Sequence, residues 1–295
     1  MSHGRISVLC LNTPSSKGRR DAMACLSLDV AAQSPYYTCD ISQTVTKETP
    51  MSWKTALQTE YPNAIDWTSL INTTGKALAG KGFTPKNTLL TNISCRDEVN
   101  ATSVDAFSKY WGENFNLSGL GGYPSGGLTG FTAYSHHVPE GGNLFVFFGP
   151  HIGISPEGEL CLVQRRGRHQ PGAACGSLLG FLSKVQANRD YTPKLTSIDP
   201  EQYLVESALI QRADKFLNAA NPGKAVTEEM YHAIQEQTYT ILDALGFEGP
   251  IALLGGIFVN TPLDEDDYFA PRHAAIINYN GQNGVKHDWY TECFS

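Results

Sequence analysis

The sequence has no apolar run long enough to cross a bilayer and no block of basic residues. Its longest apolar stretches, residues 143–149 and 251–259, fall far short of the ~20 residues that a transmembrane helix needs. Lys and Arg number 22 against 29 Asp and Glu, for a net charge of −7, and no basic run is long enough to neutralise a phosphate backbone. These absences argue against a membrane span and against a nucleic-acid partner.

A disulfide framework is also poorly supported. The cysteines number seven, an odd count, and they are scattered along a chain of 295 residues that is long enough to build a core without covalent cross-links. Reduced thiols in a reducing compartment are therefore expected.

Three common catalytic signatures are missing. The chain contains no His-Glu-x-x-His and no Gly-x-Ser-x-Gly motif, which lowers the metalloprotease and α/β-hydrolase interpretations. The glycine-rich stretch 116–130 is not followed by the Lys-Ser/Thr pair that closes a phosphate-binding loop. Tight turns and close backbone approach are the expected roles of these glycines, with an active-site wall as the alternative.

Residues 1–50 are rich in Ser and Thr and show no sustained periodicity, so we expect a loop-like or peripheral N-terminal extension there. The first 20 residues carry four basic side chains and no acid, a composition that fits the end of an organelle transit segment. A disordered terminus or an expression leftover fits equally well. No linker or internal repeat follows, so residues 51–295 are predicted to form one domain.

From residue 51 onward, apolar strand patterns alternate with helical patterns. The alternation predicts an α/β fold with a central, mainly parallel β-sheet flanked by helices. Strands are expected from Thr88 and at 144–148, 159–164, 251–259 and 273–278, and helices include 126–135, 199–217 and 227–245.

Three of these elements bring a metal-binding side chain to the same edge of the predicted sheet. Cys95 follows the first strand, His151 follows the second, and Cys175 lies in the first turn of a helix. Two thiolates and one imidazole suit Zn²⁺, and a catalytic zinc keeps a further position for water. Spacing alone leaves an alternative open, because buried cysteines and single histidines are often ordinary structural residues.

The remaining candidates have less support. His136 and His137 are neighbours on a predicted helix and point in different directions. Cys161 lies between two leucines in a predicted strand, as is typical of a core residue. The acidic run 264–267 is expected to form a solvated turn.

Several segments together resemble the limiting-CO2-inducible B (LCIB) family of algae and diatoms, also called θ-carbonic anhydrases. They are LLTNISCRDEVNA, GLGGYPSGGLTGFTAYSHHVP, NLFVFFGPHIGIS and PGAACGSLLGFL, all within residues 88–182. The family is similar in fold and zinc site to the β-carbonic anhydrases, which are dimers. The resemblance therefore implies a β-carbonic-anhydrase-like fold and a homodimer, or a heteromer with a related subunit.

By position, the resemblance assigns Cys95, His151 and Cys175 as ligands of Zn²⁺ and Asp97 as the acid of a catalytic Asp-Arg dyad. The implied activity is reversible hydration of CO2 to bicarbonate by a zinc-bound hydroxide that donates a hydrogen bond to Asp97. The implied setting is algal or diatom CO2 concentration in the chloroplast. Glu98 is expected to be a bystander.

Two departures from the β-class pattern concern the site. The His and the second Cys are three apart in that class, but here a hairpin and the basic segment RRGRH (165–169) separate them. Val99 occupies the position of the β-class arginine, so Arg96 is predicted to hold Asp97 instead. The alternatives for this arginine are Arg165, Arg166 and Arg168.

Two other functions stay open at this point. The resembled family includes members without measured hydration activity, so the chain could be a catalytically silent scaffold subunit. Cys95 as nucleophile with His151 as base would instead make a Cys-dependent hydrolase or transferase. Zinc content and the rate of CO2 hydration distinguish these functions.

Overall fold

The computed structural model describes residues 51–278 and 284–294, and the predicted extension 1–50 lies outside the described residues. The helices are α1 (Trp53–Glu60), α2 (Trp67–Ala79), α3 (Ala101–Trp111), α4 (Gly127–His136), α5 (Gly176–Ala187), α6 (Pro200–Ile210), α7 (Ala213–Leu217), α8 (Pro222–Leu245) and α9 (Tyr290–Phe294), with short 3-10 turns η1 (Glu98–Asn100) and η2 (Leu120–Gly122). The strands are β1 (Ile65–Asp66), β2 (Thr88–Ser94), β3 (Asn114–Asn116), β4 (Asn143–Gly149), β5 (His151–Gly153), β6 (Leu162–Val163), β7 (Gly172–Ala173), β8 (Ile251–Asn260), β9 (Tyr268–Ile277) and β10 (Lys286–Asp288).

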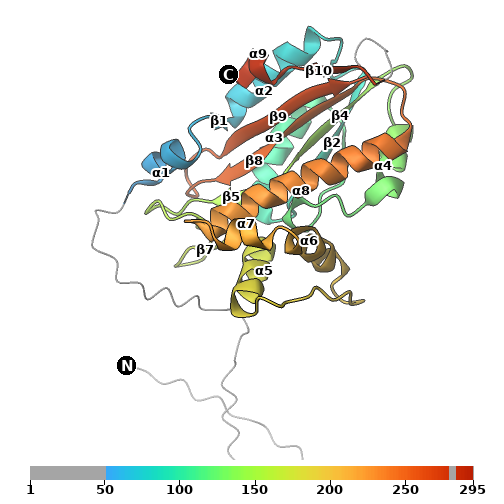
Figure 1. Cartoon of the computed structure of the whole chain (residues 1–295). Helices are drawn as coiled ribbons and strands as arrows, with labels where there is room; N and C mark the ends of the chain where they lie inside the picture. The colour runs from blue at the N-terminus through green and yellow to red at the C-terminus, as the bar shows by residue number, and fades with distance from the viewer. Residues whose placement is uncertain (1–50, 279–283, 295) are drawn as a thin grey trace, which may run out of the picture. The chain divides into compact units, whose positions relative to one another are not determined.

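Among the described residues, eight strands form one sheet in the order β1-β9-β8-β4-β2-β3, with β10 paired to β9 and β5 paired to β8 (Figure 1). The strands β3, β2, β4 and β8 run parallel, whereas β9 is antiparallel to β8. The predicted α/β fold with a mainly parallel sheet is therefore confirmed. Parallel pairing also puts the carboxyl ends of β2 and β4 at one edge of the sheet, where ligand sites form in such folds.

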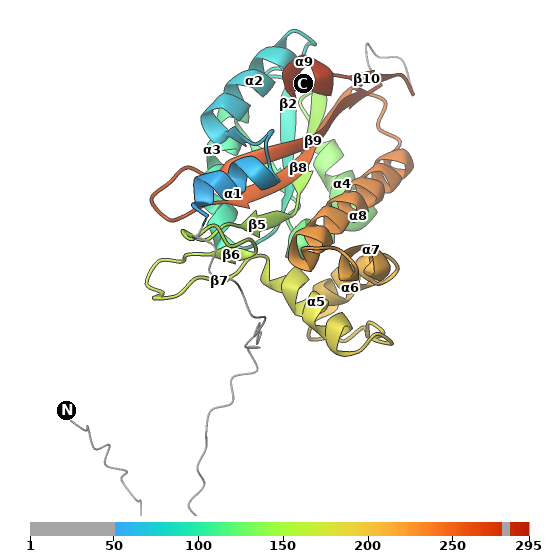
Figure 2. The same ribbon diagram turned by 60° about the vertical axis from the view of Figure 1, so that its left-hand side comes forward.

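Both faces of the sheet are covered, as β4 illustrates. Val146 and Phe148 belong to the core shared with α4, α5 and α8, whereas Phe145 and Phe147 belong to the core shared with α2 and α3. The ring of Phe107 in α3 stacks on Phe147 with centroids 4.4 Å apart. Figure 2 shows α2 and α3 on one side of the sheet and α4 and α8 on the other. Burial on both faces explains why this strand is a continuous apolar run in the sequence.

The long helix α8 begins before the predicted start at residue 227. The side chain of Asn221 accepts a hydrogen bond from the backbone N–H of Lys224 at 2.9 Å, and Pro222 occupies the first turn. Asn221 is favourable here because its side chain pairs a free N–H group of the first turn. Pro222 is favourable because it has no N–H group to pair. The helix ends at Gly246, which has a φ of +67° that glycine adopts without strain.

The single helix predicted at 199–217 is wrong. The structure has α6 ending at Ile210 and α7 beginning at Ala213. A tight turn separates them, closed by a hydrogen bond of 2.9 Å from the Arg212 N–H to the Leu209 carbonyl.

The predicted strand at 159–164 is mostly loop. Leu162–Val163 pairs, as β6, with Gly172–Ala173 of β7, and Leu160 forms an isolated bridge with Ile154. The loop 164–171 between β6 and β7 carries the basic segment. These two strands form a small sheet that is separate from the main sheet. The position of this loop matters for the candidate site because the loop contains Arg165.

The glycine-rich stretch forms turns that pack closely against the sheet. Gly122 has a φ of +80°, and a Cβ at this position would lie 2.5 Å from the carbonyl oxygen of Gly149 at the end of β4. Only glycine combines this backbone conformation with so close an approach. The predicted turn role of this stretch is confirmed.

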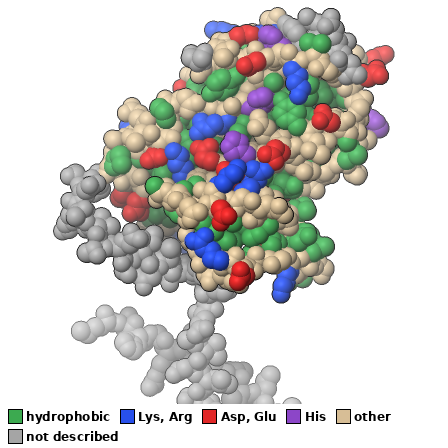
Figure 3. Space-filling view, in the orientation of Figure 1, with side chains coloured by type: hydrophobic (Ala, Val, Ile, Leu, Met, Phe, Trp, Pro, Cys, Tyr) green, Lys and Arg blue, Asp and Glu red, His purple; other side chains and the backbone are tan. Residues whose placement is uncertain are grey.

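Acidic and basic side chains are interspersed on the face seen in Figure 3, without a single block of either sign. Arg212, for example, lies 3.3 Å from Glu229 of α8.

None of the helices in the described part of the chain combines the length and the apolar composition that a bilayer crossing requires.

Tyr134→Phe is expected to lower the free energy of unfolding by about 1–3 kcal/mol. The hydroxyl of the fully buried Tyr134 donates to the Leu89 carbonyl at 2.8 Å and accepts from the Phe145 N–H at 2.9 Å, so its loss leaves buried backbone groups unpaired. Urea unfolding measures the change. Tyr231→Phe is the control, because the buried Tyr231 hydroxyl has no hydrogen-bond partner among the described residues and its removal should change stability by less than about 0.5 kcal/mol. Equal losses in the two variants would contradict this assignment.

Candidate metal centre

Three side chains from separate elements meet at the carboxyl edge of the sheet. Cys95 directly follows β2, His151 begins β5 just after β4 ends, and Cys175 caps the N-terminus of α5. Their ligating atoms all lie within 4.8 Å of one another. The chain thus brings the three predicted ligands together in a cluster that could hold a metal ion.

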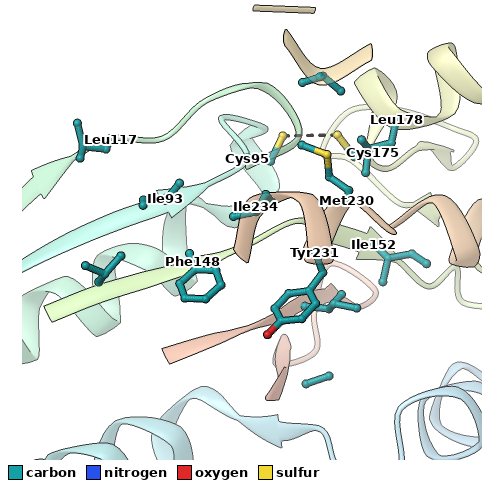
Figure 4. Packing of buried hydrophobic residues seen from close by; sticks show 14 of the residues in the cluster. Ile93, Cys95, Leu117, Phe148, Ile152, Cys175, Leu178, Met230, Tyr231 and Ile234 are labelled. Carbon is teal, nitrogen blue, oxygen red and sulfur yellow. Dashed lines mark hydrogen bonds between the residues drawn. The ribbon is translucent and has the colours of Figure 1, made fainter. Parts of the chain in front are cut away.

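The two cysteines of this cluster contact each other inside the core. The Sγ atoms of Cys95 and Cys175 lie 3.5 Å apart, and both side chains are buried (Figure 4). The hydrogen bond with Cys175 lowers the pKa of Cys95 well below its ordinary value, and the same bond raises the pKa of Cys175. A thiolate paired with a thiol is therefore favoured. A divalent cation would displace the remaining proton, because the thiolate is the ligating form.

The imidazole of His151 is fully buried and offers one ring nitrogen to an ion. Its Nδ1 lies 2.8 Å from Asn260 Oδ1, whereas its Nε2 has no hydrogen-bond partner among the described residues. Burial lowers the pKa of His151, but interaction with the Cys95 thiolate raises it above its ordinary value overall. An unpartnered buried nitrogen next to two sulfur ligands fits a soft divalent ion, of which Zn²⁺ is the common example.

Asp97 lies beside the cluster and is held by an arginine. Its Oδ2 accepts a hydrogen bond of 2.8 Å from Arg165 Nη2 and lies 3.6 Å from His151 Nε2. Its Oδ1 is buried and has no hydrogen-bond partner among the described residues. Arg165 thus fixes one carboxylate oxygen, and the other can still accept a hydrogen bond.

The predicted pairing of Arg96 with Asp97 is wrong. Arg96 donates from Nε to the Ser118 carbonyl at 2.8 Å, and its Nη2 lies 2.9 Å from Glu201 Oε1. Successive side chains of an extended chain point to opposite sides, so Arg96 turns away from the side that Asp97 occupies. The arginine that holds Asp97 is Arg165, one of the three alternatives noted in the sequence.

Glu98, predicted to be a bystander, also contacts Arg165. Its Oε1 accepts a hydrogen bond of 2.9 Å from Arg165 Nε, so two consecutive carboxylates hold the guanidinium. The Glu98 side chain is 71% exposed, and solvent weakens its share of this interaction. Residues 97 and 165 are 68 positions apart, which explains why local spacing did not identify the arginine.

The other candidates from the sequence lie outside the cluster. His136 ends α4, and the ring of His137 packs edge-on against Phe115 with centroids 5.5 Å apart. Cys161 does not lie in a strand as predicted, since it has a φ of +69° in the loop before β6. Burial raises the pKa of its thiol to about 12, which makes Cys161 unreactive at neutral pH.

The acidic run 264–267 was predicted to be a solvated turn, but the side chain of Asp267 makes internal hydrogen bonds. Its neighbours include residues that the sequence did not identify. Asp267 accepts hydrogen bonds from the Thr261 N–H at 2.9 Å and from Ser103 Oγ at 3.1 Å. Its Oδ2 also lies 3.4 Å from Nδ2 of the buried Asn260, which donates in turn to the buried Asn100. Single asparagines carry no spacing signal, so only the folded arrangement identifies them.

The chain is similar in sequence and fold to known proteins. The chain matches the family model of limiting CO2-inducible proteins B/C beta carbonic anhydrases over residues 64–278. The crystal structure of PtLCIB4, a homolog of the limiting CO2-inducible protein LCIB, is 33% identical with a TM-score of 0.73, and the match covers 80% of this chain and 98% of that chain. The crystal structure of LCIB has the same fold, with 24% identity, a TM-score of 0.63, and coverage of 79% of this chain and 96% of that chain. No curated protein matches the chain.

Purified without chelator, the protein is expected to hold about one Zn²⁺ per chain, because a site with three protein ligands binds a single ion. Cys175→Ser removes one of these ligands and should weaken zinc binding by more than about 100-fold. Cys161→Ser is the matched control, since this buried thiol lies outside the cluster. Elemental analysis and competition with a chromophoric chelator measure the effect, and equal zinc affinity in the two variants would exclude the site.

Proposed function

Because the chain belongs to the family of limiting CO2-inducible proteins B/C beta carbonic anhydrases, we propose that it catalyses the zinc-dependent, reversible hydration of CO2 to bicarbonate. The observation that carries this proposal is the carboxylate of Asp97, which Arg165 holds beside the cluster with one oxygen unpartnered. Cys95, His151 and Cys175 would hold the ion. When bound, Zn²⁺ supplies a Lewis acid that lowers the pKa of a water molecule and favours its attack on CO2.

In this proposal Asp97 orients the attacking water. Its unpartnered Oδ1 accepts a hydrogen bond from that water, which turns a lone pair of the water toward CO2. The bond of 2.8 Å from Arg165 Nη2 fixes Oδ2, which lies 3.6 Å from His151 Nε2, and so fixes the orientation of the carboxylate. Asp97 and Arg165 therefore act as one unit, and Glu98 helps to hold Arg165 in place.

The thiol side of the cluster is apolar. Leu178 and Met230 lie beside Cys95 and Cys175 in the core (Figure 4). Apolar walls exclude bulk water from the cluster and strengthen the electrostatic interactions made by the polar groups. They also suit CO2, which has no net dipole.

A cavity of about 720 Å³ lies beside Arg165, the residue that holds Asp97. Its wall includes Glu98 and Arg165 together with the apolar Val99 and Val163. This volume is ample for CO2 and bicarbonate to approach and leave.

A hydrolase with Cys95 as nucleophile is disfavoured by the geometry. The Cys95 side chain is 5% exposed, and its sulfur contacts Cys175 instead of facing a substrate cleft. A nucleophile needs access to the carbonyl that it attacks. The deep burial of the thiol suits a ligand better than a nucleophile.

The wider setting stays a prediction. We propose that the activity serves algal or diatom CO2 concentration in the chloroplast and that the chain assembles as a homodimer or with a related subunit. The basic first 20 residues that suggest an organelle lie outside the described residues.

Asp97→Asn is expected to lower kcat/KM for CO2 hydration by about 100-fold or more, since the asparagine can no longer act as a two-oxygen acceptor. Arg165→Met should lower it by about 10–100-fold, because the carboxylate loses the group that fixes its orientation. Arg96→Met should stay within about threefold of wild type, because Arg96 contacts Ser118 and Glu201 and not Asp97. A stopped-flow assay with a pH indicator on zinc-loaded proteins measures these rates.

Cys95→Ala provides the background rate for this assay. Zinc-loaded wild type with no rate above that of Cys95→Ala would make the chain a catalytically silent scaffold. Equal losses in Arg96→Met and Arg165→Met would remove the specific role of Arg165.

A further inference from the structure

A row of buried amides joins two of the three ligand positions. Asn100 donates from Nδ2 to the Cys95 carbonyl at 3.3 Å, and Asn260 donates from Nδ2 to Asn100 Oδ1 at 3.2 Å. At the other end of the row, Asn260 Oδ1 lies 2.8 Å from His151 Nδ1. Asn100 and Asn260 are each 2% exposed and His151 is 0% exposed, so solvent does not supply alternative partners.

The direction of each hydrogen bond in this row is fixed by groups that have one role only. The Cys95 carbonyl can only accept, so Asn100 turns its amide nitrogen to it and its oxygen toward Asn260. Asn260 then turns its amide nitrogen to Asn100 and its oxygen to His151. Because that oxygen can only accept, the proton of the imidazole must reside on Nδ1.

A second contact fixes the same orientation of Asn260. Its Nδ2 lies 3.4 Å from Asp267 Oδ2, and a carboxylate accepts hydrogen bonds. Asp267 is itself held by the Thr261 N–H and by Ser103 Oγ. A flipped amide would place the Asn260 oxygen against the oxygens of both Asn100 and Asp267, which is repulsive.

We propose that Asn260 is a positioning residue of the metal centre, which holds His151 as the Nδ1–H tautomer and thereby directs the unpartnered Nε2 lone pair to the ion. The inference rests on the proposed function, because it assigns a role toward the zinc ion of that site. Asn100 connects this orientation to the backbone of Cys95, and Asp267 holds the amide of Asn260 from the loop after β8. Metal-binding histidines generally donate their second N–H to such a partner, which fixes the ring and raises its basicity.

The test compares zinc affinity in Asn260→Leu, which keeps nearly the same volume without an acceptor, with that of the wild-type chain. We expect the dissociation constant for Zn²⁺, measured by competition with a chromophoric chelator, to rise about 10–100-fold. Asn143→Ala is the matched control, because Asn143 is also a buried asparagine that donates to a backbone carbonyl, Gly82 O at 3.1 Å. Asn143 begins β4, at the opposite end from His151, so its variant should change zinc affinity by less than about threefold.

A spectroscopic measurement separates positioning from a general loss of packing. In the Co²⁺-substituted protein, the Nδ1–H proton of His151 should give a resolved, solvent-exchangeable resonance in wild type and in Asn143→Ala. The resonance should be broadened by exchange in Asn260→Leu. Asn260→Ala replaces Asn260→Leu if the latter does not fold, as judged by thermal unfolding of the metal-free chain.

Zinc affinity in Asn260→Leu within about threefold of wild type, with the resonance retained, would overturn the role of Asn260 while leaving the proposed function in place. A wild-type chain that binds no zinc would overturn both. Weak binding in Asn260→Leu together with loss of the resonance, while Asn143→Ala keeps both the affinity and the resonance, would support the positioning role.

Discussion

The burial of two thiols and an imidazole at one edge of the sheet is the constraint on which the rest of this site depends. Polar groups removed from water destabilise a protein unless they are paired with suitable partners. Here the thiols are paired with each other, and His151 Nδ1 is paired with Asn260. The one ring nitrogen left over, Nε2, lies where an ion would complete the set. The cluster is thus most stable when its proton is exchanged for a cation.

The cluster has apolar surroundings on one side and charged surroundings on the other. On one side, the core under α8 surrounds the sulfur atoms with apolar side chains such as Met230. On the other side, the loop 164–171 places Arg165 against Asp97 and adjoins the cavity. In the β-class pattern the dyad arginine follows the first cysteine closely in sequence, whereas Val99 occupies that position here. The segment that separates His151 from Cys175 therefore supplies the arginine that the first segment lacks.

The sequence predicted the parts of the site that depend on strand ends and missed the parts that depend on loops. Cys95 and His151 could be placed because each follows an apolar strand, and the ends of parallel strands share one edge of the sheet. Arg96 was misplaced because proximity in sequence does not bring side chains together on an extended chain, where neighbours point apart. Arg165 reaches the site from a loop whose course the sequence pattern does not encode. Asn260 is an exception, since it ends the predicted strand β8, but a single asparagine carries no spacing signal. The same limit applies to the fold, where β2, β4 and β8 were located correctly but the first half of β9, the segment 159–164 and the break between α6 and α7 were not.

Zinc K-edge X-ray absorption of the full chain tests the central claim most directly, because it identifies the atoms that bind the ion without relying on catalysis. The Cys95, His151 and Cys175 centre predicts a first shell with two sulfur atoms, one imidazole nitrogen and a further light atom, and the loss of one sulfur in Cys175→Ser. A first shell without sulfur, or one that is unchanged in Cys175→Ser, would contradict the assignment of this cluster as the metal centre.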